Sequence, residues 1–333
     1  MPPRPTRRSV LLGALGTAAL LVTGCQEERP DNVVPTGDVD ADDPRTWPAD
    51  TQLLIAARQR VHGYLQSLDN VSLPPAARGL GQTWALQQER LEQLITLGGV
   101  PLPALLDAPA VSPSVDPVPT TDAPDDGGAT TDTSDATASP RREASVLGRV
   151  LVEDLSDAVR EASVSTPTNL AMLCSLAAQH GASAALLGAP VPWPPLAGPA
   201  GAAAVPVLSV TRPAVFGLEV VAARSSGEER AAYESVLQPL LVVTRQLETL
   251  AGETAPVPPL GYDLPEPLET AGQRRGLARA LVADIAPATL SASVRVPGDA
   301  EQLGGVVRIV AETVAWSAAL EEQAQPFPGM TLP

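Results

Sequence analysis

Residues 166–187 read TPTNLAMLCSLAAQHGASAALL, and this stretch decides the fold class. Thr166 is a favourable helix N-cap, and Pro167 suits the first helical position, where its missing N–H removes no intrahelical bond. Apolar residues then recur at helical spacing as far as about Leu187. This apolar face consists of Leu173, Leu176, Ala177, Ala184 and Leu187. The stretch therefore predicts a largely buried helix that carries His180 on its apolar face.

Helical patterns continue on both sides of this stretch, and no segment shows the alternation typical of a strand. Towards the N-terminus, Asp50 is expected to cap a first helix, and Pro74-Pro75 separates it from a second that ends at Gly98-Gly99. The sequence thus predicts an all-α protein, with an N-terminal helical hairpin and a C-terminal antiparallel four-helix bundle. The helices predicted towards the C-terminus start at Pro213, at Ser226 (with Glu229 completing a capping box), near residue 268 with a bend at Pro287, and at Asp299.

Composition divides the chain into five parts. Residues 1–24 are predicted to be a signal peptide, 25–49 a tether, 50–107 the hairpin, 108–143 a disordered linker and 144–330 the bundle. The linker is rich in Pro, Thr, Asp, Ser, Ala and Gly and lacks apolar periodicity. We expect it to be a flexible arm that lets the hairpin reach a partner at a distance.

The N-terminus has the features of an export signal. Three arginines precede an uncharged, mostly apolar run from Ser9 to Thr23, which is short for a membrane span of roughly 20 apolar residues. The run ends in Val22-Thr23-Gly24-Cys25, which resembles the lipobox of bacterial lipoprotein precursors. That resemblance implies cleavage after Gly24, lipid (diacylglyceryl and often palmitate) on Cys25, and a place at the extracytoplasmic face of the cell membrane. The stretch Thr6-Arg7-Arg8-Ser9-Val10-Leu11 also resembles a twin-arginine signal, so export by the Sec or the twin-arginine route stays open.

Charge and composition exclude several partners and reactions. The formal net charge is −16, and it becomes −19 without residues 1–24, because these contain three arginines and no acid. Nucleic acid is an unfavourable partner for such a chain. All 22 basic residues are arginine, which excludes Schiff-base lysines and a P-loop. Cys174 has no intramolecular partner once Cys25 carries lipid, and its apolar neighbours predict a buried, inert thiol.

His180 is the one candidate metal ligand. Di-iron bundles place ligands as Glu-x-x-His, because positions i and i+3 share a helix face. Here Ala177 takes the position of the glutamate, and His62 is the only other histidine. We therefore predict a core histidine held by a hydrogen bond, with no metal centre, no cofactor and no catalytic residue.

Carboxylates near the edges of the apolar faces do not pair by their spacing and are expected to be solvated. A serine-hydrolase site is also excluded, since Gly-x-Ser-x-Gly is missing. Trp316 is predicted to pack at the end of the bundle, and Glu312 to face solvent. The edge carboxylates are Asp154, Glu161, Glu219 and Glu234.

Three short motifs carry a family resemblance. They are Leu176-Ala177-Ala178-Gln179-His180, Tyr262-x-Leu264-Pro265 and Phe327-Pro328-Gly329. With them, residues from about 165 to 330 resemble the ferritin-like domain of unknown function found in actinobacterial lipoproteins. The resemblance implies a four-helix ferritin-like bundle, and it implies almost nothing about activity. Family members tend to have Glu-His where this chain has Gln179-His180, which weighs against inherited metal chemistry.

These features predict a membrane-anchored lipoprotein of the cell envelope. We expect a non-enzymatic binding or accessory module, whose partners are the membrane, through Cys25, and an envelope protein. Two alternatives stay open: a metal-binding oxidoreductase or metal store in the bundle core, and a carrier of a small apolar ligand. Inward carboxylates around His180 would favour the metal, and a dry apolar shell would favour the carrier.

Overall fold

The structure is a computed structural model that describes residues 47–69, 71–101, 135–265 and 267–331. The predicted signal peptide, its twin-arginine stretch, Cys25, nearly all of the tether and most of the linker lie outside these residues. Residues 40–333 form one compact unit.

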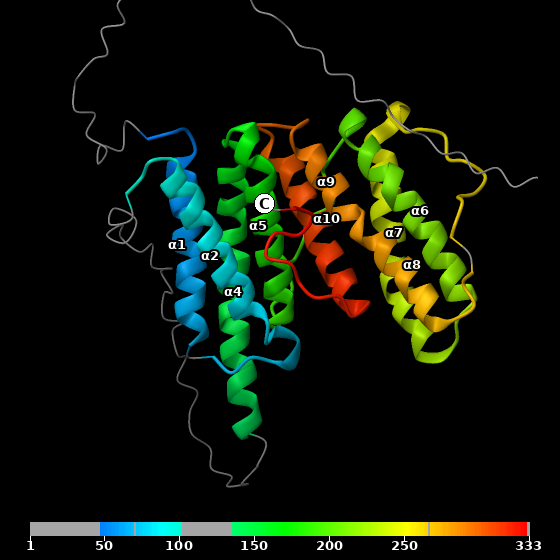
Figure 1. The fold of residues 1–333 in the computed structure, drawn as a ribbon, viewed down its shortest axis with the longest axis horizontal. Coiled ribbons are helices and arrows are strands. Elements are labelled where there is room, and N and C mark those ends of the chain that lie inside the picture. Colours follow the sequence, from blue (N-terminus) through cyan, green and yellow to red (C-terminus); the bar gives the residue numbers. More distant parts are fainter. Residues whose placement is uncertain (1–46, 70, 102–134, 266, 332–333) are drawn as a thin grey trace, which may run out of the picture. The chain divides into compact units, whose positions relative to one another are not determined.

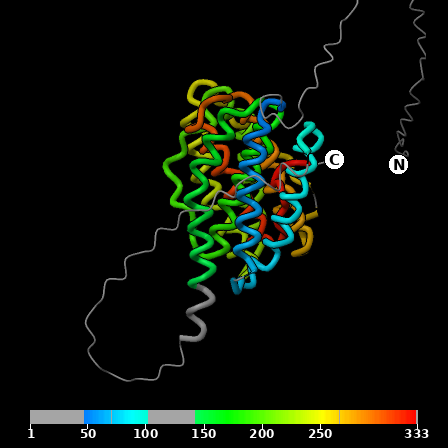
Figure 2. The backbone as a smooth tube through the Cα atoms, turned by 90° about the vertical axis from the view of Figure 1, so that its left-hand side faces the viewer, coloured from blue at the N-terminus to red at the C-terminus, as the bar shows by residue number. Residues whose placement is uncertain are grey.

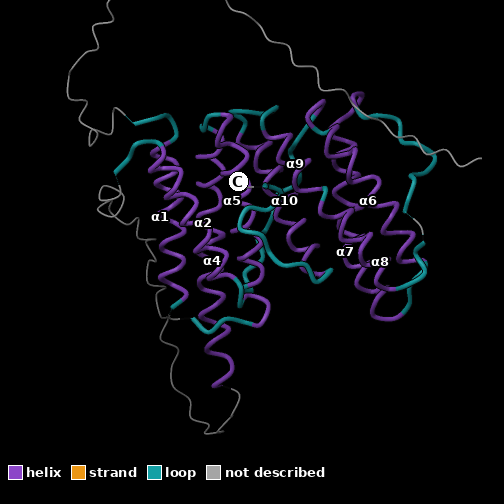
Figure 3. The backbone as a smooth tube through the Cα atoms, viewed as in Figure 1, coloured by secondary structure: helices purple, strands orange, loops and turns teal. Residues whose placement is uncertain are grey.

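Within the described residues, every regular element is helical (Figures 1 and 3). The all-α prediction is therefore confirmed. Viewed from a direction turned by 90°, the helices run along a common axis (Figure 2). The helices are α1 (Thr51–Leu68), α2 (Leu80–Leu97), α4 (Asp135–Ser163), α5 (Pro167–Leu186), α6 (Val205–Ala223), α7 (Gly227–Ala251), α8 (Ala271–Ala283), α9 (Ile285–Ser293) and α10 (Ala300–Ala319), with 3₁₀ turns η2 (Pro75–Ala77), η3 (Gly201–Ala203) and η4 (Gly252–Thr254).

Two apolar cores lie side by side and share α9 and α10. The first is formed by α1, α2, α4 and α5 together with one face of α9 and α10, and the second by α6, α7 and α8 with the opposite face. Leu303 and Val307 of α10 point into the first core, whereas Ile309 and Trp316 point into the second. The prediction that Trp316 packs in the bundle is thus confirmed.

The order of elements repeats along the chain. Two helix hairpins, α1–α2 and α4–α5, are joined by the long connection 98–134, and two more, α6–α7 and α8/α9–α10, by the connection 252–270. The connection within each hairpin runs from three residues (164–166 and 224–226) to eleven (69–79, which includes η2), and the helices that it joins are antiparallel. Figure 1 shows the two sets of helices next to each other. Each core is therefore built from the same order of elements along the chain: a hairpin, a long connection and a second hairpin.

The predicted hairpin at 50–107 is not a separate domain. Its buried residues belong to the same core as α4 and α5, and the Tyr64 hydroxyl donates a hydrogen bond to Asp154 of α4 over 2.8 Å. The physical reason is that a two-helix hairpin buries little by itself, so its apolar face needs a second pair of helices. In addition, α4 begins at Asp135, so the last part of the predicted linker is helical.

One predicted helix start and one predicted cap differ from the structure. Pro213 lies inside α6, which begins eight residues earlier, near Pro206, another proline that fits the first turn. Ser226 is the N-cap of α7 as predicted, but its side chain makes no cap hydrogen bond, and the Glu229 side chain pairs with Arg274 at 2.7 Å and does not complete a capping box. The helix predicted over 268–294 is two helices, α8 and α9, which meet at Asp284 just before Pro287.

Helix α6 is notable for its length and its apolar composition. Among the described residues, α6 alone is long and apolar enough to cross a membrane. Its Leu208, Leu218 and Val221 are fully buried in the second core. Packing in that core accounts for its apolar character.

Asp50 caps a helix other than the one predicted. Its carboxylate makes no cap on α1 and instead accepts hydrogen bonds from the Thr166 N–H at 2.9 and 3.0 Å, from the Thr166 hydroxyl and from the Asn169 amide, all at the start of α5. Burial raises the pKa of Asp50, but these hydrogen bonds outweigh it and leave the pKa below its usual value. Asp50 thereby ties the beginning of the hairpin to α5.

We expect Asp50→Ala to lower the free energy of unfolding by about 1–2 kcal/mol at neutral pH, the usual loss for a helix cap. The lowered pKa makes this contribution complete above the ordinary aspartate pKa and lost as the pH falls below it, so wild type and variant should converge in acid. Urea unfolding across pH, with Asp69→Ala at the exposed end of α1 as control, measures this. An Asp50→Ala effect no larger than the control would contradict it.

Candidate functional site

A buried polar cluster surrounds His180 in the first core. We define it as Tyr64 of α1, Trp84 and Gln87 of α2, and Gln179 and His180 of α5. Gln87 and Gln179 are 0% exposed and His180 is 3% exposed. The His180 Nε2 lies 3.1 Å from the Gln87 Oε1, and the Gln179 Oε1 accepts from the Trp84 indole and the Gln87 amide, each at 3.3 Å. The predicted core histidine is therefore hydrogen-bonded, by an amide of the hairpin.

The network assigns the histidine tautomer. Gln87 donates through its Nε2 to the Pro326 carbonyl at 2.6 Å and to Gln179, so its Oε1 is left as the acceptor facing His180. The Nε2 of His180 must then carry the proton. Burial lowers the pKa of His180 to about 3, with the charge of Arg60 as a smaller cause. The imidazole is thus neutral at physiological pH.

Two of the carboxylates that were expected to be solvated instead form a hydrogen bond or an ion pair with side chains of α1. Asp154 accepts from the Tyr64 hydroxyl, and Glu161 forms a two-bond pair with Arg60, the Arg60 Nη1 lying 2.8 Å from its Oε1. Burial raises the pKa of Asp154 against the opposing effects of Tyr64 and Arg60. The Tyr64 ring stands edge-on to His180 with its centroid 5.1 Å away, so an aromatic ring separates the imidazole from these acids.

The other carboxylates that the sequence analysis singled out lie away from the polar cluster around His180. Glu219 is exposed, and Glu234 pairs with Arg230 at 2.7 Å. Glu312 was predicted to face solvent, but it is largely buried beside Arg308 at 2.9 Å, and burial raises its pKa. The reason is that the loop around Pro194, whose carbonyl accepts from Arg308, covers that side of α10.

The described part of the chain holds no cluster of metal-ligating side chains. No group of three or more His, Cys, Asp or Glu side chains converges there. The neighbours of His180 are amide and aromatic groups, which hold a neutral imidazole in place. Cys174 is buried as predicted, and burial raises the pKa of its thiol to about 12.

The C-terminal segment, residues 321–331, crosses the first core and is fixed at two places. At its start, Arg279 of α8 donates to the Leu320 carbonyl at 2.7 Å and pairs with Glu322 at 3.0 Å. Further along, Phe327 is buried, and the carbonyls on either side of it accept from Gln87 and from the Ser175 hydroxyl, the latter at 2.8 Å. The polar cluster therefore binds the segment's backbone.

Gly329 explains part of the Phe327-Pro328-Gly329 motif. It has φ +77°, and a Cβ there would come within 2.7 Å of the Ala286 backbone. Only glycine allows the chain to turn this close to α9.

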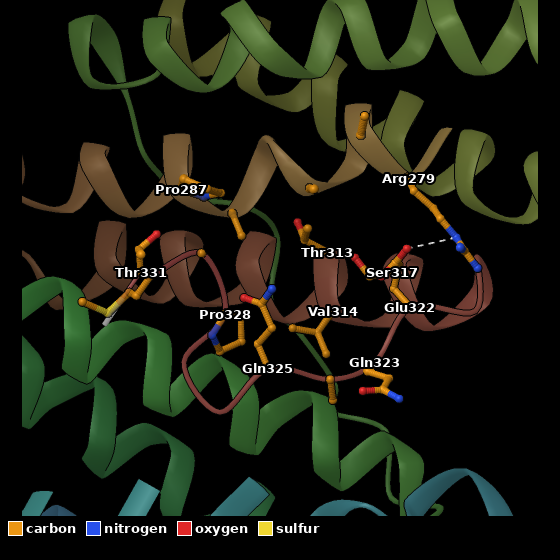
Figure 4. A pocket seen from close by; sticks show the side chains of 16 residues that line it. Arg279, Pro287, Thr313, Val314, Ser317, Glu322, Gln323, Gln325, Pro328 and Thr331 are labelled. Atoms are coloured by element: carbon orange, nitrogen blue, oxygen red, sulfur yellow. Dashed lines mark ion pairs between the residues drawn. The ribbon is translucent and has the colours of Figure 1, made fainter. Parts of the chain in front are cut away.

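A groove lies between the C-terminal segment and α8, α9 and α10 (Figure 4). Its volume is about 510 Å³, within the range of ligand sites. Ala280, Ala283 and Pro287 form one wall, and Val314 and Ser317 of α10 lie at its base. The side chains of the C-terminal segment that line it are Glu322, Gln323, Ala324, Gln325, Pro328, Met330 and Thr331.

The groove combines apolar and hydrogen-bonding surface. Small apolar side chains come from α8 and α9, while Ser317, Gln323 and Gln325 supply hydroxyl and amide groups. The Arg279–Glu322 ion pair closes one end (Figure 4). Such a lining suits a neutral ligand with apolar and hydrogen-bonding parts better than a highly charged one.

The sequence reasoning missed Gln87, Ser175 and Tyr64. One signal was present for Gln87, since it follows Trp84 by three residues and precedes Leu91 by four, which puts an amide in the middle of an apolar face. Its partners could not be read from the sequence, because Gln87 and Pro326 are separated by most of the chain.

The comparisons with known proteins add no family to this geometry. No protein-family model, curated protein or solved structure matches the chain.

Proposed function

We propose that this chain is a lipid-anchored lipoprotein of the cell envelope, whose helical body is a non-enzymatic binding module that takes its ligand or partner in the groove beside the C-terminal segment. The observation that carries the binding role is the groove itself, an open site of about 510 Å³ with an apolar wall and hydroxyl and amide groups.

The anchor is supported by the sequence. Arginines, an apolar run and Val22-Thr23-Gly24-Cys25 follow one another in the order of a lipoprotein signal. Lipid chains on Cys25 would hold the protein at the membrane, since each buried CH₂ contributes about 0.8 kcal/mol.

We further propose that helices α6 to α10, the part of the predicted bundle that follows α5, are ferritin-like in arrangement. Ferritin-like bundles join two helix hairpins by one long crossover. The connection 252–270 between α7 and α8 has that place among α6, α7, α8/α9 and α10, which surround the second core. The amide and aromatic neighbours of His180 support a structural role for the first core, and they favour the binding module over a metal store.

Photo-crosslinking in the bacterium of origin tests the groove. A benzoylphenylalanine at Ala283 places the reactive group on an exposed wall of the groove, and one at Ala315 places it on exposed α10 surface outside the lining. We expect a discrete adduct from position 283, seen as a heavier band for a protein partner or as a modified peptide mass for a small molecule.

Position 315 is the matched control. It is expected to give no such adduct, because it does not line the groove. Irradiated cells that yield no adduct at position 283, or the same adduct at both positions, would refute the proposal that the groove is the binding site.

A further inference from the structure

One end of the first core has a distinctive surface. It is formed where three segments meet: residues 47–49 before α1, residues 96–101 at the end of α2, and residues 162–166 between α4 and α5. We call it the tether end, because the chain from Cys25 enters the described structure there. Figure 1 shows all three at the upper end of these helices.

Contacts hold the three segments together. The Pro48 side chain lies beside Gly98, 3.6 Å from the position of a Cβ there. The next residue but one, Asp50, binds the backbone N–H of Thr166. The tether end is therefore one continuous surface of the fold.

The tether end exposes large apolar side chains. Leu97 is 82% exposed and Val164 is 71% exposed. Trp47, in the first of the three segments, is partly packed on the first core. Tryptophan is enriched where proteins meet the membrane–water interface.

The same surface lacks charge. None of the residues in 47–49, 96–101 and 162–166 is Asp, Glu, Lys, Arg or His, in a chain that is 18% charged. The nearest acids are occupied, since Asp50 binds Thr166 and Asn169, and Glu161 pairs with Arg60. An anionic bilayer repels the body as a whole, and this neutral end is the part that can approach it.

From these observations we infer that the tether end docks on the lipid bilayer, with Leu97 and Val164 in the interfacial region. The inference rests on the proposed lipid anchor. Cys25 lies about twenty residues before Trp47, so the segment between them spans at most about 80 Å and keeps the body close to the membrane. Anchoring makes the contact intramolecular, and a small apolar surface is then enough to orient the body.

Site-directed quenching tests this docking. The mature lipoprotein, with a cysteine-reactive fluorophore on Leu97→Cys or Val164→Cys, is placed in phosphatidylcholine–phosphatidylglycerol vesicles that contain a spin-labelled lipid. Native Cys174 is buried and unreactive, and Cys25 is consumed by lipid. We expect both labels to lose most of their fluorescence, while labels on exposed Val242→Cys and Leu260→Cys keep theirs.

The outcomes separate this inference from the proposed anchor. Intact mass of the same sample reports lipid on Cys25. If that lipid is missing, a chain that begins at Cys25 and carries p-azidophenylalanine at position 97 or 164 is coupled through the Cys25 thiol to a maleimide lipid and labelled at the azide, and quenching at positions 97 and 164 then still supports docking. Unquenched labels at these positions in anchored protein overturn it, as does quenching equal to that at positions 242 and 260.

Discussion

Replacing Gln87 with leucine is expected to lower the free energy of unfolding by about 3–5 kcal/mol. The change leaves two groups without their partner: the His180 N–H in a fully buried position and the Pro326 carbonyl in a partly buried one. It also removes one of the two contacts that bind the C-terminal segment around Phe327. We therefore expect the loss of stability to be accompanied by faster amide exchange in residues 321–331.

Gln93→Leu is the matched control for this experiment. Gln93 lies on the exposed face of the same helix, and its side chain makes two long hydrogen bonds of 3.3 Å, one to Glu89 and one from Arg90. Its replacement should change stability by less than about 0.5 kcal/mol. Urea unfolding and hydrogen exchange measure both effects. If Gln87→Leu were as stable as wild type, the network drawn around His180 would be wrong.

Acid sensitivity should depend on His180. Its pKa is about 3 in the folded protein against about 6.5 for an exposed histidine, so between these values the unfolded chain binds a proton that the folded chain does not. The free energy of unfolding should consequently fall by about 1.4 kcal/mol for each pH unit below 6.5 from this residue alone. The stabilisation is complete above that pH and is lost progressively as the pH falls towards 3.

His180→Gln isolates this effect. Glutamine can keep a donor near the Gln87 Oε1 but cannot be protonated. The variant therefore loses the part of the pH dependence of stability that comes from His180, while the part that comes from the carboxylates remains. We expect the variant to be less stable than wild type at neutral pH because of packing, and the difference to shrink or reverse near about pH 4. Parallel pH curves for wild type and His180→Gln would contradict the neutral, buried imidazole.

Local features of the fold were predictable from the sequence. Helical periodicity and the cap at Asp299, whose carboxylate accepts from the Gln302 N–H at 3.0 Å, gave the all-α class and most helix ends. These features depend on residues within three or four positions of one another. Pro213 was misread because a proline can start a helix or lie inside one, and tertiary packing decides between the two.

Long-range partnerships were not predictable. An apolar face on the hairpin indicates that something covers it, but the sequence does not say that α4 and α5 do so. In the same way, Asp50 has the signature of a cap for its own helix, and only the fold places it at the start of α5. His180 was identified from its place on an apolar face, whereas its hydrogen-bond partner Gln87 comes from a different hairpin.

The groove was also outside the reach of sequence reasoning. It depends on the path of the C-terminal segment, which has no periodicity of its own. The Phe327-Pro328-Gly329 motif marked this segment as notable. Its role as one wall of a groove follows from Gly329 turning against α9 and from Gln87 and Ser175 binding the backbone.

The most direct test of a lipid-anchored binding module is the intact mass and N-terminal peptide mass of the protein purified from the membranes of a bacterium that expresses it. We expect residues 1–24 to be missing and the mature chain to begin at Cys25 with a diacylglyceryl group on its thiol, while Cys25→Ser keeps the uncleaved N-terminus. A wild-type chain that retains residues 1–24, or that begins elsewhere with an unmodified Cys25, would contradict it.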